Sequence, residues 1–214
     1  MLFRSKVPEN LPWHLIPMAE PLVISMHAIK QSETKAGQHV AITGAGQIGL
    51  LAAQYALVIG AIPIVIDPVE ERLELSRKLG VTHTINPTAV DVVEEIKRIT
   101  SGRMAEVVIE ASGAAPAIRA AIDYVSYAGH ISLVGWPKND IPLPTALFTK
   151  KELTIRGSRN SVGQFPESLR LIAEGKVNVA ALLTKTVPFL DLPVTVKDIS
   201  DHPDKYLKVV GVFE

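Results

Sequence analysis

Short apolar runs alternate with amphipathic segments through most of the chain. The apolar runs, which are bounded by Gly, Pro and polar residues, predict strands. They cover residues 39–43, 62–66, 83–85, 105–110, 130–134 and 152–156. Other segments repeat apolar residues at helical spacing and predict helices. These helices cover residues 19–30, 47–59, 69–79, 89–99, 116–125 and 166–175.

Strands and helices alternate from residue 39 to residue 156. Consecutive parallel strands need a crossover connection, which a helix supplies with a right-handed turn. Parallel strands are buried on both faces and therefore apolar throughout, which agrees with a hydrophobic content of 47%. The pattern predicts an α/β fold with a doubly wound, six-stranded parallel sheet of the Rossmann type.

Both ends of the chain depart from this alternation. Residues 1–17 contain three prolines and are predicted to be irregular. Residues 182–214 hold two apolar patches, 182–189 and 206–213, separated by a sequence rich in Asp and Pro. These patches predict a pair of strands without an obvious sheet to join.

Composition and charge exclude several classes of function. The 214 residues include 22 basic and 22 acidic side chains and no basic run, so neither nucleic acid nor an anionic membrane is an expected partner. The chain has no cysteine, so it offers no disulfide framework and no thiolate metal site. Residues 1–6 lack the apolar segment of a secretory signal, and Gly60 and Pro63 interrupt the apolar stretch 49–66. We therefore expect a cytoplasmic protein.

A glycine motif of the form G-x-G-x-x-G follows the first predicted strand and opens the next helix. In this setting the first glycine, Gly44, allows a tight turn, and Gly46 lets the backbone approach a pyrophosphate. Gly49 allows close packing of the helix on the strand, and the helix N-terminus offers free N–H groups to the phosphates. The predicted pyrophosphate site consists of Gly44, Gly46, Gln47, Ile48 and Gly49. A lone motif is weak evidence, but here strand, turn and helix occur in register.

An acidic residue, Asp67, ends the second predicted strand about 20 residues after the motif, where a dinucleotide site needs one. Its carboxylate can accept hydrogen bonds from both ribose hydroxyls and would repel a 2′-phosphate. The residue that follows is Pro68 and not an arginine, so the sequence favours NAD over NADP. Arg72, one turn into the next helix, is predicted to cover the adenine.

Three further loops follow the ends of predicted strands, at residues 111–113, 134–136 and 157–160. Ligands of open α/β sheets bind at the carboxyl ends of the strands, so each loop is a candidate for contact with the ligand. An ordinary glycine turn explains each loop equally well.

Several segments together resemble one enzyme family. They are residues 18–22 (Met-Ala-Glu-Pro-Leu), the helix that ends in residues 27–28, the glycine motif 44–49, and the segments 110–113 and 133–135. In this combination the chain resembles the zinc-dependent medium-chain alcohol dehydrogenases, and among them the sorbitol dehydrogenase-like polyol branch. The resemblance covers roughly residues 10–214.

The resemblance implies three regions. Residues 1–18 would be a remnant of a β-rich catalytic domain, residues 19–180 the NAD-binding domain, and residues 181–214 a tail that returns to the catalytic domain. In the family, the catalytic domain lies in the first half of the protein and supplies the cysteine and the His-Glu pair that bind the catalytic zinc. The resemblance therefore implies the NAD-binding part of an oxidoreductase that acts on a polyol or a secondary alcohol.

The resemblance also implies roles for single residues. Glu20 would lie beside the zinc, as a ligand or as the partner of zinc-bound water, and Ser112, Val134 and Arg159 would lie near the nicotinamide. From the residues alone, Glu20 is simply an acid in a first helical turn, where the helix dipole favours it. The histidines show no metal-ligand spacing either. We do not expect this chain alone to hold zinc.

Three functional interpretations remain open. The first is the cofactor half of a zinc polyol dehydrogenase that binds NAD but oxidises little or no alcohol by itself. The second is a non-enzymatic NAD-binding module or partner subunit. The third is a zinc-free NADPH-dependent reductase, which Asp67 and the pair Glu20-Pro21 disfavour. Because an unpaired apolar strand edge is a template for another strand, we also expect a homodimer or homotetramer through residues 152–158.

Overall fold

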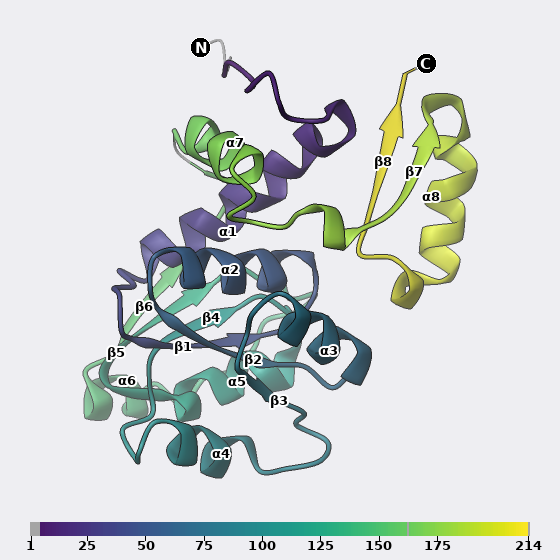
Figure 1. The fold of residues 1–214 in the computed structure, drawn as a ribbon. Coiled ribbons are helices and arrows are strands. Elements are labelled where there is room, and N and C mark those ends of the chain that lie inside the picture. The colour runs from purple at the N-terminus through teal and green to yellow at the C-terminus, as the bar shows by residue number, and fades with distance from the viewer. Residues whose placement is uncertain (1–4, 162, 214) are drawn as a thin grey trace.

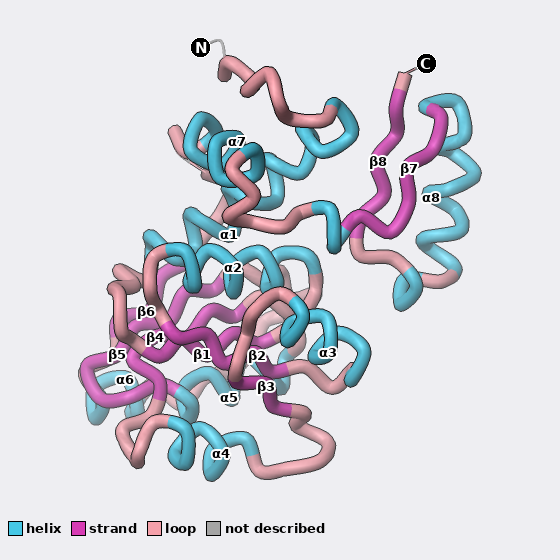
Figure 2. Tube along the Cα trace, viewed as in Figure 1, coloured by secondary structure: helices cyan, strands magenta, loops and turns pink. Residues whose placement is uncertain are grey.

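The computed structural model describes residues 5–161 and 163–213, without the side chain of Pro203. Most of this part forms one parallel sheet with helices on both faces (Figure 1, Figure 2). The strands of this sheet are β1 His39–Thr43, β2 Ile62–Ile66, β3 His83–Ile85, β4 Ala105–Glu110, β5 Val125–Leu133 and β6 Thr154–Gly157. They lie in the order β3-β2-β1-β4-β5-β6.

Every neighbouring pair in this sheet is parallel. The chain therefore has the predicted doubly wound Rossmann fold. From β1 the strand order runs outward to β3, and from β4 it runs the other way to β6. The switch point lies between β1 and β4, and the carboxyl ends of the strands at such a point are where α/β sheets bind ligands.

Helices form a layer on each face of the sheet. One face is covered by α1 Ala19–Gln31, α2 Gln47–Val58 and α3 Glu70–Lys78, with α7 Phe165–Ala173 packed against α1 (Figure 1). The other face is covered by α4 Val92–Ile99, α5 Ala115–Tyr124 and α6 Ala146–Lys151. Strand side chains alternate between the layers. In β1, Val40 and Ile42 belong to the cluster beneath α1 and α2, whereas Ala41 belongs to the opposite cluster.

Several predicted boundaries shift by a few residues. Helix α4 begins at Val92 and not at residue 89, because Asp91 caps it: the Asp91 side chain accepts a hydrogen bond from the Glu94 N–H at 3.1 Å. Helix α5 ends at Tyr124. Val125, which continues the apolar stripe of that helix, is instead the first residue of β5.

The segment before the last strand of the sheet was not predicted as a helix. Residues 146–151 form α6, and Glu152 follows it in the left-handed conformation with a φ of 54°. The strand predicted from residue 152 therefore begins only at Thr154. A helix of six residues gives too short a periodicity to be recognised in the sequence.

The C-terminal tail contains the two strands predicted for it, β7 Leu183–Pro188 and β8 Lys208–Val212. They pair with each other in parallel and form a separate two-stranded sheet, with α8 Leu192–Asp201 between them in the chain (Figure 1). Helix α8 was not predicted, because the segment is rich in Asp and Pro. Pro193 stands in the first turn, where a helix tolerates proline.

Short 3-10 helices complete the described part of the chain. They are Trp13–Met18, Ala180–Leu182, Phe189–Asp191 and Pro203–Lys205. Trp13–Met18 gives regular structure to a region predicted to be irregular, and Met18 at its end is fully buried. No helix within residues 5–161 and 163–213 combines the length and the apolar character needed to cross a membrane.

Candidate cofactor site

The glycine turn connects the end of β1 to the start of α2 at the switch point of the sheet. Gly44 has a φ of +95°, in the left-handed region that favours glycine. A Cβ atom added to Gly49 would lie 1.8 Å from the carbonyl oxygen of Gly44, so the helix packs too closely on the turn for any side chain. A Cβ atom added to Gly46 would meet nothing within 4 Å in the described structure. Gly46 therefore faces open space, into which a ligand can approach the backbone.

The surroundings of the turn fit a pyrophosphate group. The first amide groups of α2 have no helical partner, and the positive end of the helix dipole lies at the same place. The Nε2 atom of Gln47 is buried and finds no hydrogen-bond partner among the described residues. A phosphate oxygen is an acceptor that would satisfy it. The carbonyl oxygen of Ile48 accepts a hydrogen bond from Ser25 Oγ at 2.8 Å, which ties the start of α2 to α1.

Asp67 lies at the end of β2, against the glycine turn, and is 4% exposed. Its Oδ2 accepts a hydrogen bond from the Ala45 N–H at 2.7 Å, and its Oδ1 accepts one from the Val69 N–H at 2.9 Å. These bonds fix the carboxylate beside the turn, and each oxygen keeps a lone pair for a further donor. Arg72 lies in the first turn of α3 and is half-buried.

A cleft of about 630 Å³ opens beside the ends of β5 and β6. Val134 and Arg159, two of the predicted nicotinamide neighbours, line it together with Trp136 and Ser158. The Arg159 guanidinium lies 5.0 Å from the centre of the Trp136 ring, close enough for a cation–π interaction. The Oγ of Ser158 is buried and finds no hydrogen-bond partner within the described part of the chain.

The loop that follows β4 lies between the glycine turn and this cleft. The Ser112 side chain approaches the turn: its Cβ would lie 3.0 Å from a Cβ added to Gly44. Gly113 approaches the cleft, because a Cβ added to it would lie 3.0 Å from the backbone nitrogen of Trp136. The turn, the Ser112 loop and the cleft therefore form a continuous row along the carboxyl edge of the sheet.

Two residues of this row were given no individual role from the sequence, although they belong to the segments 110–113 and 134–136 named above. Trp136 is 75% exposed although it is large and aromatic, and it lines the cleft. Glu110, the last residue of β4, is fully buried although it is acidic. An acid at the end of an apolar run, with Ser112 and Gly113 two and three residues later, is a signal that could have identified it, because a turn after the strand offers backbone N–H groups and a serine hydroxyl to a carboxylate.

Within the described part of the chain, the side chains do not form a zinc site. No group of three or more His, Cys, Asp or Glu side chains arranged to hold a metal ion occurs within residues 5–161 and 163–213. Glu20 lies in the first turn of α1 and is exposed. His27, further along the same helix, is buried and contacts Gln31, with 3.1 Å between their Nε2 atoms.

Comparison with known proteins gives the context of this site. Residues 48–174 match the model of the family described as zinc-binding dehydrogenase. An uncharacterized zinc-type alcohol dehydrogenase-like protein of Haemophilus influenzae is 51% identical over 209 residues, which cover 98% of this chain and 61% of that protein. The D-xylulose reductase of Saccharomyces cerevisiae is 34% identical over 214 residues, which cover 97% of this chain and 60% of the reductase. The chain thus spans about 60% of the length of these relatives.

Solved structures agree with the sequence comparison. The 2R,3R-butanediol dehydrogenase of Bacillus subtilis matches with a TM-score of 0.90 at 26% identity, over 98% of this chain and 60% of that one. An alcohol dehydrogenase of Escherichia coli complexed with NADH matches with a TM-score of 0.89 at 25% identity, over 98% of this chain and 62% of that one. A zinc-binding dehydrogenase of Sinorhizobium meliloti bound to NADP matches with a TM-score of 0.88 at 26% identity, over 97% of this chain and 62% of that one. On the extent of the family match and the identity to these relatives, the chain belongs to the zinc-binding dehydrogenase family.

Proposed function

We propose that this chain is the NAD-binding part of an oxidoreductase that transfers hydride between a polyol or a secondary alcohol and NAD. The observation that carries the proposal is the glycine turn, with Gly46 open to a ligand and the carboxylate of Asp67 held 2.7 Å from the Ala45 N–H. The polyol class is supported by relatives described as D-xylulose reductase and sorbitol dehydrogenase.

NAD is the cofactor that the site favours over NADP. The carboxylate of Asp67 has acceptor capacity left for the ribose hydroxyls, and its negative charge would repel a 2′-phosphate. Arg72 in the following helix is proposed to cover the adenine. Of the solved structures similar to this chain, one holds NADH and another holds NADP, so calorimetry on the chain itself tests this preference.

Different loops along the carboxyl edge of the sheet bind different parts of NAD. The glycine turn and the start of α2 bind the pyrophosphate, and Ser112, Val134 and Arg159 position the nicotinamide over the cleft. Bound NAD supplies the ring that accepts hydride from the substrate carbon. By orienting that ring and shielding one of its faces, these residues contribute proximity, which is a large part of many catalytic barriers.

Zinc chemistry is assigned to the part of the relatives that this chain does not match. We propose that Glu20 lies beside the zinc of the complete enzyme and that residues 1–18 and 181–214 contact the catalytic domain, while residues 19–180 form the NAD-binding domain. The described residues alone offer no metal-ligand group that would polarise a substrate oxygen. We therefore expect these 214 residues to bind NAD and to oxidise little or no polyol.

Calorimetric titration with NAD and with NADP tests the proposal. We expect one NAD per chain and at least about tenfold weaker binding of NADP, which corresponds to about 1.4 kcal/mol. A folded chain that binds neither cofactor would contradict the proposal, and preferential binding of NADP would revive a zinc-free NADPH reductase.

Mixing with the separately produced N-terminal part of the Haemophilus influenzae relative tests the enzymatic role. Restored, zinc-dependent oxidation of xylitol or sorbitol supports the cofactor half of a polyol dehydrogenase. NAD binding without restored activity, together with stable binding of another protein, supports a non-enzymatic NAD-binding module. Turnover of a polyol by the chain alone would contradict the proposal that this chain binds NAD and that another domain supplies the zinc chemistry.

Assembly and location are part of the same proposal. We propose a homodimer or homotetramer through the edge strand at residues 152–158, with the cytoplasm as the compartment and a small alcohol or polyol as the substrate of the complete enzyme. Strand β6 lies at the end of the six-stranded order, so its outer edge is unpaired within the described chain.

A further inference from the structure

We propose that Glu110 is a positioning residue for the cofactor site, whose buried carboxylate holds the loop after β4 against the glycine turn. The inference rests on the proposed binding of NAD. Glu110 is the last residue of β4 and is 0% exposed. It is paired in register with Thr43 of β1 and with Leu133 of β5, so it stands at the carboxyl edge at the centre of the sheet.

The Glu110 carboxylate is surrounded by donors from two strand ends. Its Oε1 accepts hydrogen bonds from Thr43 Oγ1 at 3.2 Å, from the Ser112 N–H at 2.9 Å and from the Ser112 hydroxyl. The Gly113 N–H lies 3.2 Å from each of the two carboxylate oxygens. A carboxylate only accepts, and donors from the backbone compensate for the loss of water around a buried acid.

The backbone of Glu110 organises the neighbouring strand at the same point. Its carbonyl oxygen accepts hydrogen bonds from the Val134 and Gly135 N–H groups, both at 2.9 Å. A Cβ added to Gly135 would lie 2.4 Å from the Glu110 Oε2 and 2.1 Å from the Gly113 nitrogen. The backbone of Gly113 and the Glu110 carboxylate together occupy the space that a side chain at Gly135 would need.

These contacts connect Glu110 to both parts of the cofactor site. Thr43 directly precedes Gly44, and the Ser112 Cβ lies 3.0 Å from the position of a Cβ on Gly44. On the other side, Gly113 lies against Trp136 of the cleft. If the carboxylate no longer holds this loop, Ser112 moves away from the glycine turn and Gly113 moves away from Trp136.

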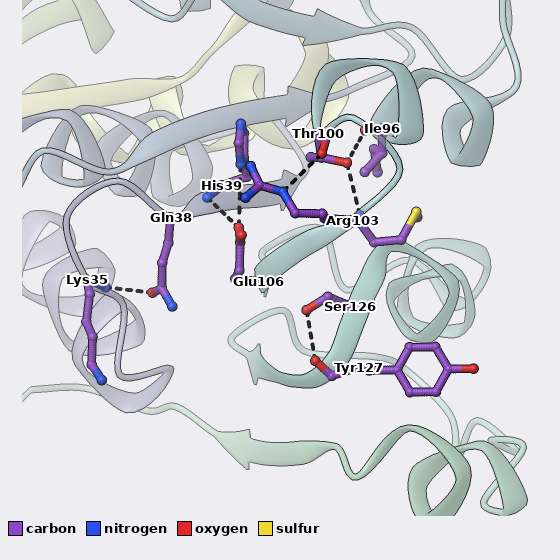
Figure 3. Close-up of polar contacts among 10 residues, drawn as sticks. Lys35, Gln38, His39, Ile96, Thr100, Arg103, Glu106, Ser126 and Tyr127 are labelled. Carbon is purple, nitrogen blue, oxygen red and sulfur yellow. Dashed lines mark hydrogen bonds and ion pairs between the residues drawn. The ribbon is translucent and has the colours of Figure 1, made fainter.

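Another acid of the same strand provides a matched control. Glu106 lies near the amino end of β4, where its Oε2 accepts a hydrogen bond from the His39 N–H at 2.8 Å and lies 3.5 Å from His39 Nδ1 (Figure 3). It joins β4 to β1 just as Glu110 does, but at the edge of the sheet opposite the cofactor site. Glu110 is fully buried and the Glu106 side chain is 30% exposed, so the two variants are compared by NAD affinity and by exchange near the cofactor site, and not by their stability.

The experiment compares Glu110→Gln with Glu106→Gln. Glu110→Gln removes the negative charge and turns one acceptor oxygen into an NH₂ donor that faces the Gly113 N–H, so the hydrogen bonds that hold the loop are weakened. We expect NAD affinity to fall at least about tenfold in Glu110→Gln and to stay within about twofold in Glu106→Gln, as measured by calorimetry well below each melting temperature. Amide hydrogen exchange should accelerate at residues 44–46 and 112–113 in Glu110→Gln alone.

The two readouts separate this inference from the proposed function. A wild-type chain that binds no NAD contradicts the proposed function, and the exchange measurement then decides the inference by itself. Unchanged exchange at residues 44–46 and 112–113 in Glu110→Gln overturns the inference, and so does unchanged NAD affinity in a wild type that binds. If Glu110→Gln does not fold, Ser112→Ala removes one donor to the carboxylate and keeps the Cβ beside Gly44. It should then weaken NAD binding about threefold or more and accelerate the same amides, and wild-type values in both measurements would overturn the inference.

Discussion

The three glycines of the turn are glycine for three different physical reasons. Gly44 needs a positive φ, which side-chain-bearing residues adopt only at a cost. Gly49 has the carbonyl oxygen of Gly44 in the place of a Cβ, 1.8 Å away. Gly46 has neither constraint, because its φ is −75° and the space for a Cβ is empty within the described structure. Gly46 is also the N-cap of α2, where glycine is a favoured residue, and the open space beside it leaves its backbone accessible to a ligand.

Gly46→Ala should therefore separate cofactor binding from stability. We expect NAD affinity to fall at least about tenfold, because a methyl group would occupy the approach of the pyrophosphate. The free energy of unfolding should change by less than about 1 kcal/mol, a loss limited to the weaker capping of α2 by alanine. Calorimetry and urea unfolding measure the two quantities. Gly49→Ala is the matched control and should cost about 1–3 kcal/mol through overpacking. Equal NAD affinity in Gly46→Ala and wild type would contradict the proposed site.

His27 predicts how stability depends on pH. Burial, and then the charge of Lys30, lower the pKa of His27 below its ordinary value of 6.5. As the pH falls through 6.5, His27 becomes protonated in the unfolded chain while it is still neutral in the folded chain. The contribution of neutral His27 to stability is thus present above that pH and is lost as the pH falls toward the pKa of the folded state.

Replacement of His27 tests this dependence. The free energy of unfolding of the wild type should decrease between about pH 7.5 and about pH 5.5, and the decrease should be smaller in His27→Gln. Urea unfolding at a series of pH values measures both slopes. His202→Gln is a suitable control, because His202 is exposed on the tail and pairs with Asp198. If the slopes of wild type and His27→Gln coincide, His27 is not responsible.

Among the elements, the junction between α5 and β5 depends on a contact from a third segment. Helix α5 ends at Tyr124 and the strand begins at the next residue without a turn. Lys151 at the end of α6 donates hydrogen bonds from Nζ to the carbonyl oxygens of Ile122 and Val125, at 2.7 and 2.8 Å. Burial lowers the pKa of Lys151, although the nearby Asp123 opposes this shift. The ammonium group therefore caps carbonyl groups that the helix leaves unpaired.

Lys151→Met should destabilise the fold by about 1–2 kcal/mol, because the carbonyl groups lose a charged donor while the apolar stem is kept. The neighbouring Lys150 is exposed, so Lys150→Met should change the free energy of unfolding by less than about 0.5 kcal/mol. Urea unfolding of the two variants measures the difference. Similar values for both would mean that the two carbonyl groups are satisfied by water.

The same junction shows what the sequence could predict about the elements. All six strands of the large sheet were predicted, because parallel strands buried on both faces appear as continuous apolar runs. Helices α6 and α8 were missed, since one is six residues long and the other lies in a segment rich in Asp and Pro. The end of α5 was misplaced because Val125 is apolar in either element, and its contacts with Ala105 of β4 and with Lys151 come from residues distant in the sequence.

The candidate site was predictable to the extent that it depends on spacing. The glycine turn and Asp67 were predicted to bind the same dinucleotide, and in the structure the Asp67 carboxylate accepts a hydrogen bond from the Ala45 N–H of the turn. The role of Glu110 was not predicted, because an isolated acid at the end of a strand usually faces solvent. Its burial depends on Thr43 and Ser112, which are brought together only by the pairing of the strands.

For the molecule as a whole, large apolar side chains are exposed at both terminal segments. They are Trp13 in the N-terminal segment and Phe189, Leu190 and Phe213 in the tail, where the rings of Phe189 and Phe213 stack with centroids 4.2 Å apart. Exposed apolar groups of this kind mark surfaces that associate with protein. We propose that the two terminal segments contact the catalytic domain of the complete enzyme. Association of subunits is proposed at a different place, the edge of β6, and is tested there.

The hydrogen bonds of β6 show which of its groups are free. The Ser158 N–H donates to the carbonyl oxygen of Leu133 in β5 at 2.8 Å. Successive N–H groups of a strand point to opposite sides, so those of Ile155 and Gly157 point away from β5 toward the outer edge. A second copy of this strand would accept from them, and a proline at position 157 would remove one donor without disturbing the ladder to β5.

Gly157→Pro should therefore convert a dimer into a monomer. A Cβ at Gly157 meets nothing within 4 Å in the described structure, so Gly157→Ala is a control that should leave the assembly intact. Light scattering at micromolar concentration should give twice or four times the chain mass of 23.1 kDa for the wild type and for Gly157→Ala. Gly157→Pro should give a smaller assembly, because the added strand cannot pair at that position. A wild-type monomer, or an assembly that Gly157→Pro leaves unchanged, would place the contact between subunits elsewhere.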